Sequence, residues 1–218
     1  MDRLTALLLE RHAQELPPLA GYPLTSHRFA VGEKLAASGD PLTSLCFVAE
    51  GRATVHRTLE NGSAVLLREY GGLHTVGELE LLMGYPTLTG DVRALTAGAL
   101  LALPLPATRE RIFADPVLLA YLAREVARKL EHTSRIAAQD HFYPLAERLA
   151  AYLLYARRGD RLPLNWMRVS DLMGASYRHQ LRVLHDFCEA GWLVRAPEGY
   201  RIRDEAALRL LGGAIRYD

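Results

Sequence analysis

The sequence predicts an α+β chain in which a β-rich first half is followed by one long helix and then by short helices closed by a β-hairpin. Three observations predict this order: short apolar segments between turn residues, a helical apolar period in the middle, and two short helical segments before a hairpin pattern. With 218 residues, 50% of them hydrophobic, the chain is long enough for one large domain or two small ones.

The region from residue 26 to about residue 104 reads as short apolar segments, each closed by turn residues, at the spacing of a β-barrel or β-sandwich. Its clearest predicted strands are 44–49, 53–57 and 64–69. Between the last two stands Asn61-Gly62, a strong hairpin signal because both residue types tolerate a positive φ. This region is therefore expected to consist of strands and tight turns.

A long helix is predicted to begin at Asp115-Pro116, because aspartate is a favoured N-cap and proline fits the first helical position. No glycine or proline interrupts the chain from there to Pro144. The apolar stripe is wider than a coiled-coil seam, so one side is expected to pack on its own barrel and the other on a partner helix. The residues expected in that dimer interface are Leu119, Leu122, Val126 and Leu130. A single amphipathic helix of a monomer is the alternative.

The C-terminal region carries the pattern of a winged helix. A second helix is expected at about 145–156, and two shorter helices, 169–173 and 176–189, follow with Gly174-Ala175 between them. That is helix-turn-helix spacing. The hairpin expected after them consists of 192–195, the turn 196–199 and 200–203. A helix-turn-helix followed by such a hairpin is typical of a domain that reads DNA.

The second helix of this pair has the pattern of a DNA recognition helix. Leu181, Leu184 and Phe187 fall at helical spacing and are expected to face the core. Arg178 and Arg182 lie four residues apart on the outward side, where a guanidinium can bond bidentately to guanine O6 and N7. The expected DNA contacts are Ser176, Tyr177, Arg178, His179 and Arg182 in the helix, with Arg195 and Arg201 in the hairpin. A charged, solvated helix face is the alternative.

Charge is distributed unevenly along the chain. The net charge is only +1, but residues 141–218 hold twelve arginines against nine acidic residues, whereas residues 1–140 carry a small acidic excess. The basic excess at the C-terminal end favours a polyanionic partner there.

Cysteine content and hydropathy exclude other classes of protein. Cys46 and Cys188 are too few for a disulfide framework or a four-thiolate iron–sulfur cluster, and both are expected to be buried small hydrophobes. No stretch approaches the roughly 20 apolar residues of a membrane span, and the mixed charges of Asp2 and Arg3 differ from those of a signal peptide. We therefore expect a cytoplasmic protein with no membrane partner.

From about residue 26 to residue 211, the order of elements resembles the CRP/FNR superfamily of transcriptional regulators. In the first half, residues 29–35 with 39–41 are similar to the opening strands of a cyclic-nucleotide-binding domain, 77–82 to its phosphate-binding cassette and 92–94 to the strand after the cassette. Residues 115–134 are similar to the family's dimerisation helix. Residues 169–174, with 176 onward, are similar to its helix-turn-helix. The resemblance implies a double-stranded β-helix (jelly-roll) sensor domain at 1–114, a dimerisation helix at 115–140 and a winged helix-turn-helix DNA-binding domain at 141–218.

The resemblance also implies a function. It is that of a sequence-specific regulator, not an enzyme, which binds palindromic double-stranded DNA as a homodimer, with RNA polymerase as a further partner. A small-molecule effector, of unknown identity, would bind in the β-barrel. The pocket residues implied by the matching positions are Gly77, Glu78, Leu79, Thr89, Thr133 and Ser134.

The match to a cyclic-nucleotide site is uneven. Glu78 occupies the place of the cassette glutamate that holds the ribose 2′-hydroxyl in the family. In the family, an arginine about ten residues after this glutamate holds the cyclic phosphate. That arginine is missing here, since Thr87, Leu88 and Thr89 stand at those positions. Losing that charged bond forfeits roughly 1.5–3 kcal/mol, so cyclic AMP is expected to bind weakly or not at all unless Arg93 or another basic residue substitutes.

The recognition helix departs from the family's cAMP receptor as well. That receptor has an Arg-Glu pair just after its serine, whereas this chain has Tyr177-Arg178. Without the glutamate, nothing at its position accepts a hydrogen bond from cytosine N4, so a different operator sequence is expected. Arg182 matches the family's later base-reading arginine.

Three alternatives stay open. One is an effector-independent, constitutive DNA-binding regulator with a degenerate sensor barrel. Another is a cupin-like metalloenzyme. Enzymes of that kind bind their metal through two histidines one residue apart, and His27, His56 and His74 of this chain form no such pair. A haem sensor would need an axial ligand, for which His12, His56, His74 and His132 are the candidates. No cofactor and no metal site are therefore assigned.

Overall fold

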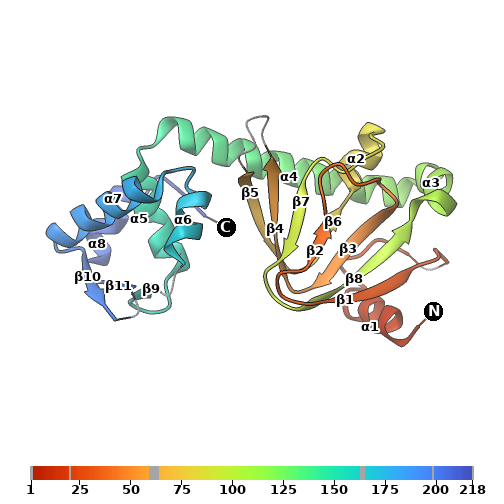
Figure 1. Ribbon diagram of the computed structural model, residues 1–218, viewed down its shortest axis with the longest axis horizontal. Helices are drawn as coiled ribbons and strands as arrows, with labels where there is room; N and C mark the ends of the chain where they lie inside the picture. Colours follow the sequence, from red (N-terminus) through yellow and green to blue (C-terminus); the bar gives the residue numbers. More distant parts are fainter. Residues whose placement is uncertain (1, 20, 59–63, 163–164, 198, 218) are drawn as a thin grey trace. The chain divides into compact units, whose positions relative to one another are not determined.

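The computed structural model describes residues 2–19, 21–58, 64–162, 165–197 and 199–217 (Figure 1). The chain divides into two compact units, Met1–Glu131 and His132–Asp218. The hairpin turn predicted at Asn61-Gly62 lies outside the described residues, as does Glu198 in the predicted second hairpin.

The N-terminal unit is a β-barrel. Its described residues form two four-stranded antiparallel sheets, with strand orders β1-β8-β3-β6 and β2-β7-β4-β5 (Figure 1). The strands are β1 (Thr25–Phe29), β2 (Lys34–Ala36), β3 (Ser44–Glu50), β4 (Arg52–Thr58), β5 (Ala64–Gly71), β6 (His74–Val76), β7 (Asp91–Ala94) and β8 (Gly98–Pro104). The three strands predicted most clearly are confirmed as β3, β4 and β5, and the two sheets form the expected jelly roll.

Strand β3 shows how the sequence builds this unit, because it is apolar on both faces. Leu45 and Phe47 belong to a core that the sheet forms with helices, whereas Val48 packs with Phe29 and Leu100 between the two sheets. A strand covered on both sides reads as a continuous apolar run rather than as a strict alternation. That is the pattern at 44–49 in the sequence.

Helices cover one side of the barrel. They are α1 (Arg3–Arg11), α2 (Glu78–Met83), α3 (Leu105–Ala114) and the start of α4 (Pro116–Phe142). The predicted start of the long helix is confirmed, since the Asp115 carboxylate accepts hydrogen bonds from the N–H groups of Val117 at 3.0 Å and Leu118 at 3.1 Å. The sequence reading did not anticipate α1 or α3, which are short helices without a long periodic stripe.

The long helix α4 presents different residues to its own barrel and to solvent. Leu118 and Leu122 are 0% exposed and belong to the barrel-side core, so Leu122 is not free to contact a second copy and its assignment to the dimer interface was wrong. The reason is helical geometry, since a spacing of four residues keeps both on one face. Leu130 is 65% exposed, and Leu119 and Val126 are partly buried.

The C-terminal unit is a winged helix. Its helices are α5 (Leu145–Ala156), α6 (Trp166–Leu172), α7 (Tyr177–Glu189) and α8 (Glu205–Gly212), and its strands are β9 (Arg161–Leu162), β10 (Leu193–Ala196) and β11 (Gly199–Ile202). The predicted α5, helix-turn-helix and hairpin are confirmed. Helix α6 begins earlier than expected because the Asn165 side chain caps it, accepting from the Arg168 N–H at 3.2 Å. Strand β9 completes a sheet of order β10-β11-β9, and neither β9 nor α8 was predicted.

One predicted core residue of α7 is on the wrong side. Leu181 is 38% exposed, whereas Gln180 is 0% exposed and lies with Leu184 and Phe187. Residues 180, 184 and 187 follow the i, i+4, i+7 spacing of one helical face, and Leu181 is turned about 100° from it. A polar residue therefore occupies the position in the core that the sequence reading gave to a leucine.

Cys46 and Cys188 are both free thiols and are only partly buried, although each packs against an apolar cluster. Burial raises the pKa of the Cys46 thiol to about 11. Within the described residues, none of the helices has both the length and the apolar character needed to cross a membrane.

Candidate functional site

The N-terminus of α7 is held by a side-chain cap. The Ser176 hydroxyl oxygen accepts a hydrogen bond from the backbone N–H of His179 at 3.2 Å, as expected of a serine at this position. The hydroxyl proton stays available for an acceptor outside the helix. Ser176, Tyr177 and His179 are all exposed, so the first turn of α7 presents its polar groups to solvent.

The exposed face of α7 carries the predicted base-contacting arginines. Arg178 and Arg182 are both exposed and lie one helical turn apart. Leu184 and Phe187 on the opposite face are buried in the core of the unit. All residues of the predicted DNA-contacting set in this helix and at its cap are thus exposed.

The hairpin places its two predicted arginines differently. Arg195 in β10 is exposed and lies opposite Tyr200 of β11 in the strand register. Arg201 lies opposite Val194 and is partly buried. Successive residues of a strand point to opposite faces, so Arg201 and Tyr200 do not share a face.

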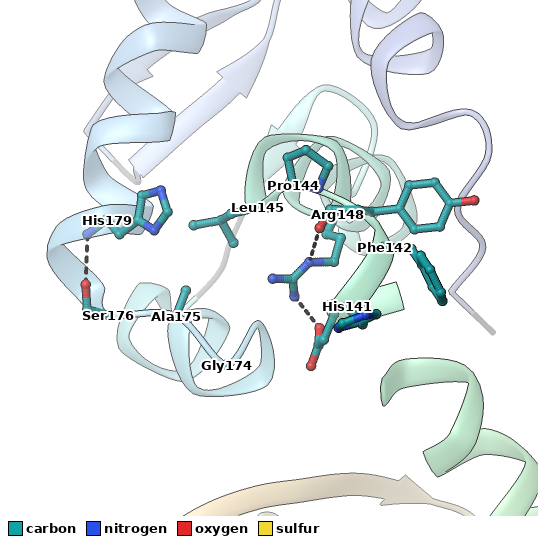
Figure 2. A pocket seen from close by; sticks show the side chains of 11 residues that line it. His141, Phe142, Pro144, Leu145, Arg148, Gly174, Ala175, Ser176 and His179 are labelled. Carbon is teal, nitrogen blue, oxygen red and sulfur yellow. Dashed lines mark hydrogen bonds and ion pairs between the residues drawn. The ribbon is translucent and has the colours of Figure 1, made fainter. Parts of the chain in front are cut away.

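A pocket of about 530 Å³ lies beside the N-terminus of α7 (Figure 2). It is lined by the end of α4, the start of α5 and the turn of the helix-turn-helix, including Arg148, Ser176 and His179. Figure 2 shows the Arg148 guanidinium between the end of α4 and the turn of the helix-turn-helix.

Arg148 is a buried cation that the sequence reading did not single out. Its Nε donates to the Tyr143 carbonyl at 3.1 Å, Nη1 donates to the Met173 carbonyl at 2.9 Å, and Nη1 also pairs with the Asp140 carboxylate. Burial raises the pKa of Asp140 and the Arg148 charge opposes that shift. A signal existed, because Arg148 falls three residues after Leu145 on the apolar face of α5.

The second group of predicted residues lies in the barrel, around the start of α2. Gly77 precedes the helix with φ +94°, and a Cβ there would lie 3.0 Å from Leu42 Cδ1 and 3.2 Å from the Ser44 carbonyl. Glycine is therefore required by both conformation and space. Glu78 follows as the first residue of α2 and is only 2% exposed.

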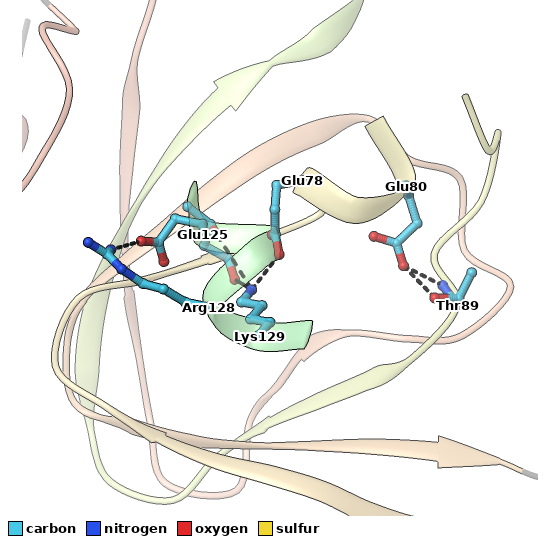
Figure 3. Close-up of polar contacts among 7 residues, drawn as sticks. Glu78, Glu80, Thr89, Glu125, Arg128 and Lys129 are labelled. Carbon is cyan, nitrogen blue, oxygen red and sulfur yellow. Dashed lines mark hydrogen bonds and ion pairs between the residues drawn. The ribbon is translucent and has the colours of Figure 1, made fainter. Parts of the chain in front are cut away.

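Glu78 is paired with Lys129 of α4 (Figure 3). Lys129 Nζ lies 2.5 Å from Glu78 Oε1 and donates to the Thr75 carbonyl at 2.8 Å. Glu78 Oε2 is buried and has no hydrogen-bond partner in the described part of the chain. The cassette glutamate is thus neutralised by a cation from the same chain.

Two stacked rings, Tyr70 and His74, lie beside Lys129 of this ion pair. His74 stacks on Tyr70 at a ring-centroid distance of 4.7 Å, and Lys129 Nζ lies 5.2 Å from the Tyr70 ring centre. The Arg68 guanidinium lies 4.7 Å from that ring centre. Burial lowers the pKa of His74 to about 4, and the charge of Lys129 acts in the same direction, so the imidazole is neutral near pH 7.

The other predicted pocket residues differ in whether their side chains are engaged within the chain. Thr89 donates to Glu80 Oε1 through both its backbone N–H at 2.9 Å and its hydroxyl at 2.6 Å (Figure 3). The Leu79 side chain is 39% exposed. Thr133 and Ser134 are exposed residues of α4.

Arg93 lies on the outer face of its strand. It is exposed on β7, between the buried Val92 and Ala94, and therefore points away from the barrel interior. Its Nη1 donates to the Gly32 carbonyl at 2.8 Å. The arginine considered as a substitute for the phosphate clamp is thus on the outer face.

Sequence reasoning missed Lys129, Thr75 and the Tyr70–His74 stack. Lys129 could have been found, since it follows Leu122 by seven residues and so falls on the helix face that packs on the barrel. Thr75, Tyr70 and His74 give no comparable signal, because the lysine that they surround comes from a helix distant in sequence. Among the described residues, no group of three or more histidine, cysteine, aspartate or glutamate side chains is placed to hold a metal ion.

Two family models match the chain. A cyclic nucleotide-binding domain matches residues 26–115, and a Crp-like helix-turn-helix domain matches residues 147–211. These segments correspond to the barrel and to the winged helix described above.

Named relatives align with most of the chain. The Regulatory protein YeiL of Escherichia coli O157:H7 is 28% identical over 190 residues, which cover 87% of this chain and 85% of the relative. The cAMP-activated global transcriptional regulator CRP of Haemophilus influenzae is 25% identical over 148 residues, which cover 66% of each chain.

Solved structures share the fold. The c-di-GMP responsive global regulator CLP of Xanthomonas campestris aligns with a TM-score of 0.71 at 19% identity, covering 91% of this chain and 99% of its own. A CRP-family transcriptional regulator from Thermus thermophilus aligns with a TM-score of 0.68 at 23% identity, covering 86% of this chain and 96% of its own. With its cyclic nucleotide-binding-like barrel and Crp-like helix-turn-helix, this chain belongs to the CRP/FNR family of transcriptional regulators, which are not enzymes.

Proposed function

We propose that this chain binds palindromic operator DNA as a homodimer, with α7 in the major groove and the β10–β11 hairpin against the sugar–phosphate backbone. The observation that supports this most is the division of α7 into two faces. Arg178 and Arg182 are exposed on one side, and Leu184 and Phe187 are buried on the other. A helix anchored in this way can enter a groove while its own core stays intact.

The proposed contacts differ in kind. Arg178 and Arg182 each contact a guanine, because a guanidinium matches O6 and N7 bidentately. Ser176 and Arg195 contact phosphates, which position the protein without reading sequence. Two-fold symmetry then requires a palindrome whose half-sites lie about 10 base pairs apart. Because Tyr177-Arg178 replaces the Arg-Glu pair of the cAMP receptor, the preferred half-site differs from the one that receptor reads.

The test is selection of binding sites from random DNA by the full-length protein, followed by affinity measurements over a range of salt concentrations. Arg182→Ala should lose preference at one guanine per half-site, at a cost of about 1–3 kcal/mol. Arg195→Ala should weaken binding to every sequence alike and reduce the salt dependence. If Arg178→Ala and Arg182→Ala weakened all sequences equally, α7 would contact only the backbone and the proposed readout would be wrong.

We also propose that cyclic AMP is not the effector. The residues of the barrel do not fit its phosphate, because no cation stands at 87–89 and Arg93 is on the outer face of β7. Titration calorimetry should therefore detect weak binding or none. A sub-micromolar Kd would contradict this and would point to Arg68 or Lys129 as the phosphate partner.

A constitutive regulator is the second candidate, and the pairing of Glu78 with Lys129 favours it. A cassette carboxylate that is neutralised within the chain needs no ligand to balance its charge. The two candidates differ in one measurement, the operator affinity of protein that has been unfolded, freed of small molecules and refolded. Full affinity supports the constitutive regulator, whereas affinity restored only by a small-molecule extract supports effector control.

The barrel at 1–114 acts as the sensor or dimer body, 115–140 as the dimerisation helix and 141–218 as the DNA-binding domain. A regulator of this kind acts in the cytoplasm, where bacterial DNA lies, and RNA polymerase is its proposed protein partner.

A further inference from the structure

The buried side of the recognition helix contains one amide. Gln180 is 0% exposed and lies between the exposed Arg178 and Arg182 in sequence, on the face of α7 that packs into the unit. Its Nε2 donates a hydrogen bond to the backbone carbonyl of Trp166, the first residue of α6, at 2.9 Å. The two helices of the helix-turn-helix are therefore joined by a directional bond as well as by apolar packing.

The same tryptophan contacts the hairpin. The Trp166 ring meets the Tyr200 ring edge to face, with centroids 5.1 Å apart and planes at 81°. Gly199, the residue before Tyr200, has no side chain, and a Cβ there would lie 3.2 Å from Trp166 Nε1. Tyr200 is directly opposite Arg195 in the strand register. Trp166 thus lies between the helix that carries Arg182 and the strand that pairs with Arg195.

We propose that Gln180 and Trp166 are positioning residues that hold the recognition helix and the hairpin at one mutual orientation, so that base-reading and phosphate-contacting arginines meet the same DNA segment. The proposal rests on the DNA-binding function proposed above. In this proposal, neither Gln180 nor Trp166 touches DNA. Both act through the arginines whose directions they set.

The energetics of Gln180 favour a role in orientation over a role in stability. Gln180 Oε1 and Trp166 Nε1 are buried, and neither has a hydrogen-bond partner among the residues that the structure describes. A buried amide whose oxygen has no hydrogen-bond partner is less favourable than an apolar side chain of similar size. Apolar contacts tolerate rotation of a helix about its axis, whereas a hydrogen bond weakens steeply with misalignment. Gln180 therefore restricts the rotation of α7.

The test uses Gln180→Met, which keeps the length of the side chain and removes the donor, with Gln180→Leu as a second variant. For each full-length variant, three quantities are measured: thermal stability, affinity for the selected operator and affinity for scrambled DNA. We expect both variants to be at least as stable as the wild type and to bind scrambled DNA equally well. The ratio of operator to scrambled affinity should fall by about tenfold or more, the scale of one lost arginine–guanine contact.

Val183→Ala is the matched control. It shortens a buried apolar side chain of the same helix and leaves the Gln180 bond in place, so it should lower stability without lowering the affinity ratio. A wild-type affinity ratio in Gln180→Met and Gln180→Leu would overturn the proposal. Failure of both variants to fold would also overturn it, because Gln180 would then be a core requirement.

The link to the hairpin is tested separately. Trp166→Leu removes the contact with Tyr200, and Trp166→Phe retains an aromatic ring there. In the Trp166→Leu background, adding Arg195→Ala should weaken operator binding less than it does in the wild type, whereas Trp166→Phe should behave as the wild type. Additive effects in both backgrounds would contradict the coupling. If the wild-type protein itself showed no preference for any sequence, the proposed function would fail instead.

Discussion

Lys129 Nζ of the long helix α4 donates a hydrogen bond to Oε1 of the buried Glu78 carboxylate, at the start of α2, over 2.5 Å. This pair joins two segments that are far apart in sequence, and Lys129 also ties α4 to the sheet through the Thr75 carbonyl. Removing one partner of a buried ion pair leaves an uncompensated charge, which costs more than the pair itself contributes.

We therefore expect Lys129→Met to lower the free energy of unfolding by about 3 kcal/mol, because Glu78 loses its counterion in a buried site. The double variant Glu78→Gln/Lys129→Met should recover most of that loss. Lys34→Met is the control, since Lys34 pairs with Asp91 at 3.7 Å with half of its side chain exposed, and it should cost less than about 1 kcal/mol. Denaturant unfolding at pH 7 measures all three, and equal losses in the two lysine variants would contradict the assignment.

The pH dependence of stability should reveal His74. Its pKa is about 4 in the folded chain because of burial, against an ordinary value of 6.5. Between these values the unfolded chain binds a proton that the folded chain does not, so stability is lost as the pH falls from 6.5 to 4, by up to about 3 kcal/mol. His74→Phe should remove this part of the pH dependence.

Denaturant unfolding at about pH 7, 5.5 and 4.5 measures the difference between wild type and His74→Phe across the window that these pKa values define. His185→Phe, at an exposed position of α7, should keep the pH dependence of the wild type. If the curves of wild type and His74→Phe stayed parallel over the whole window, His74 would not be the group that couples folding to protons.

The proposed homodimer makes a prediction about α4. Leu130 is exposed and follows Val126 by one turn, so Leu130→Arg should shift sedimentation from dimer to monomer. Leu122→Arg is unsuitable, because Leu122 is in the barrel core. Leu210→Arg changes an exposed leucine of α8 and should leave the dimer unchanged. Unaltered sedimentation of Leu130→Arg would place the interface elsewhere.

Arg148 makes a prediction about the C-terminal unit. Arg148→Met removes the donor to the Tyr143 and Met173 carbonyls and leaves Asp140 without this counterion, so the unit should lose about 2–4 kcal/mol of stability. Hydrogen exchange of the amides of α5 and α6 in the full chain measures the loss. Arg209→Met, at an exposed ion pair within α8, should change the exchange by less than about 1 kcal/mol. Similar exchange in both variants would exclude a special role for Arg148.

Much of the fold could be predicted because its signals are local. Apolar runs between turns predicted β3, β4 and β5, Asp115-Pro116 predicted the start of α4, and glycine between two short periodic segments predicted the helix-turn-helix. Short elements without such signals, including α1, α3, β9 and α8, were missed. Their residues adopt these conformations because they pack against segments that are distant in sequence. Helix α8, for example, packs so closely on α5 that a Cβ at Gly212 would lie 2.5 Å from the Ala151 nitrogen.

Residue type and spacing within single elements were enough to predict the order of the barrel strands, the long helix and the winged helix, the cap at Ser176 and the outward arginines of α7. Packing between elements was needed to learn that Lys129 neutralises Glu78, that Leu122 belongs to the barrel rather than to a dimer interface, and that Gln180 instead of Leu181 faces the core. Those outcomes depend on which side of a helix meets another element, and an amphipathic pattern leaves that rotation undetermined within about one residue, or roughly 100°.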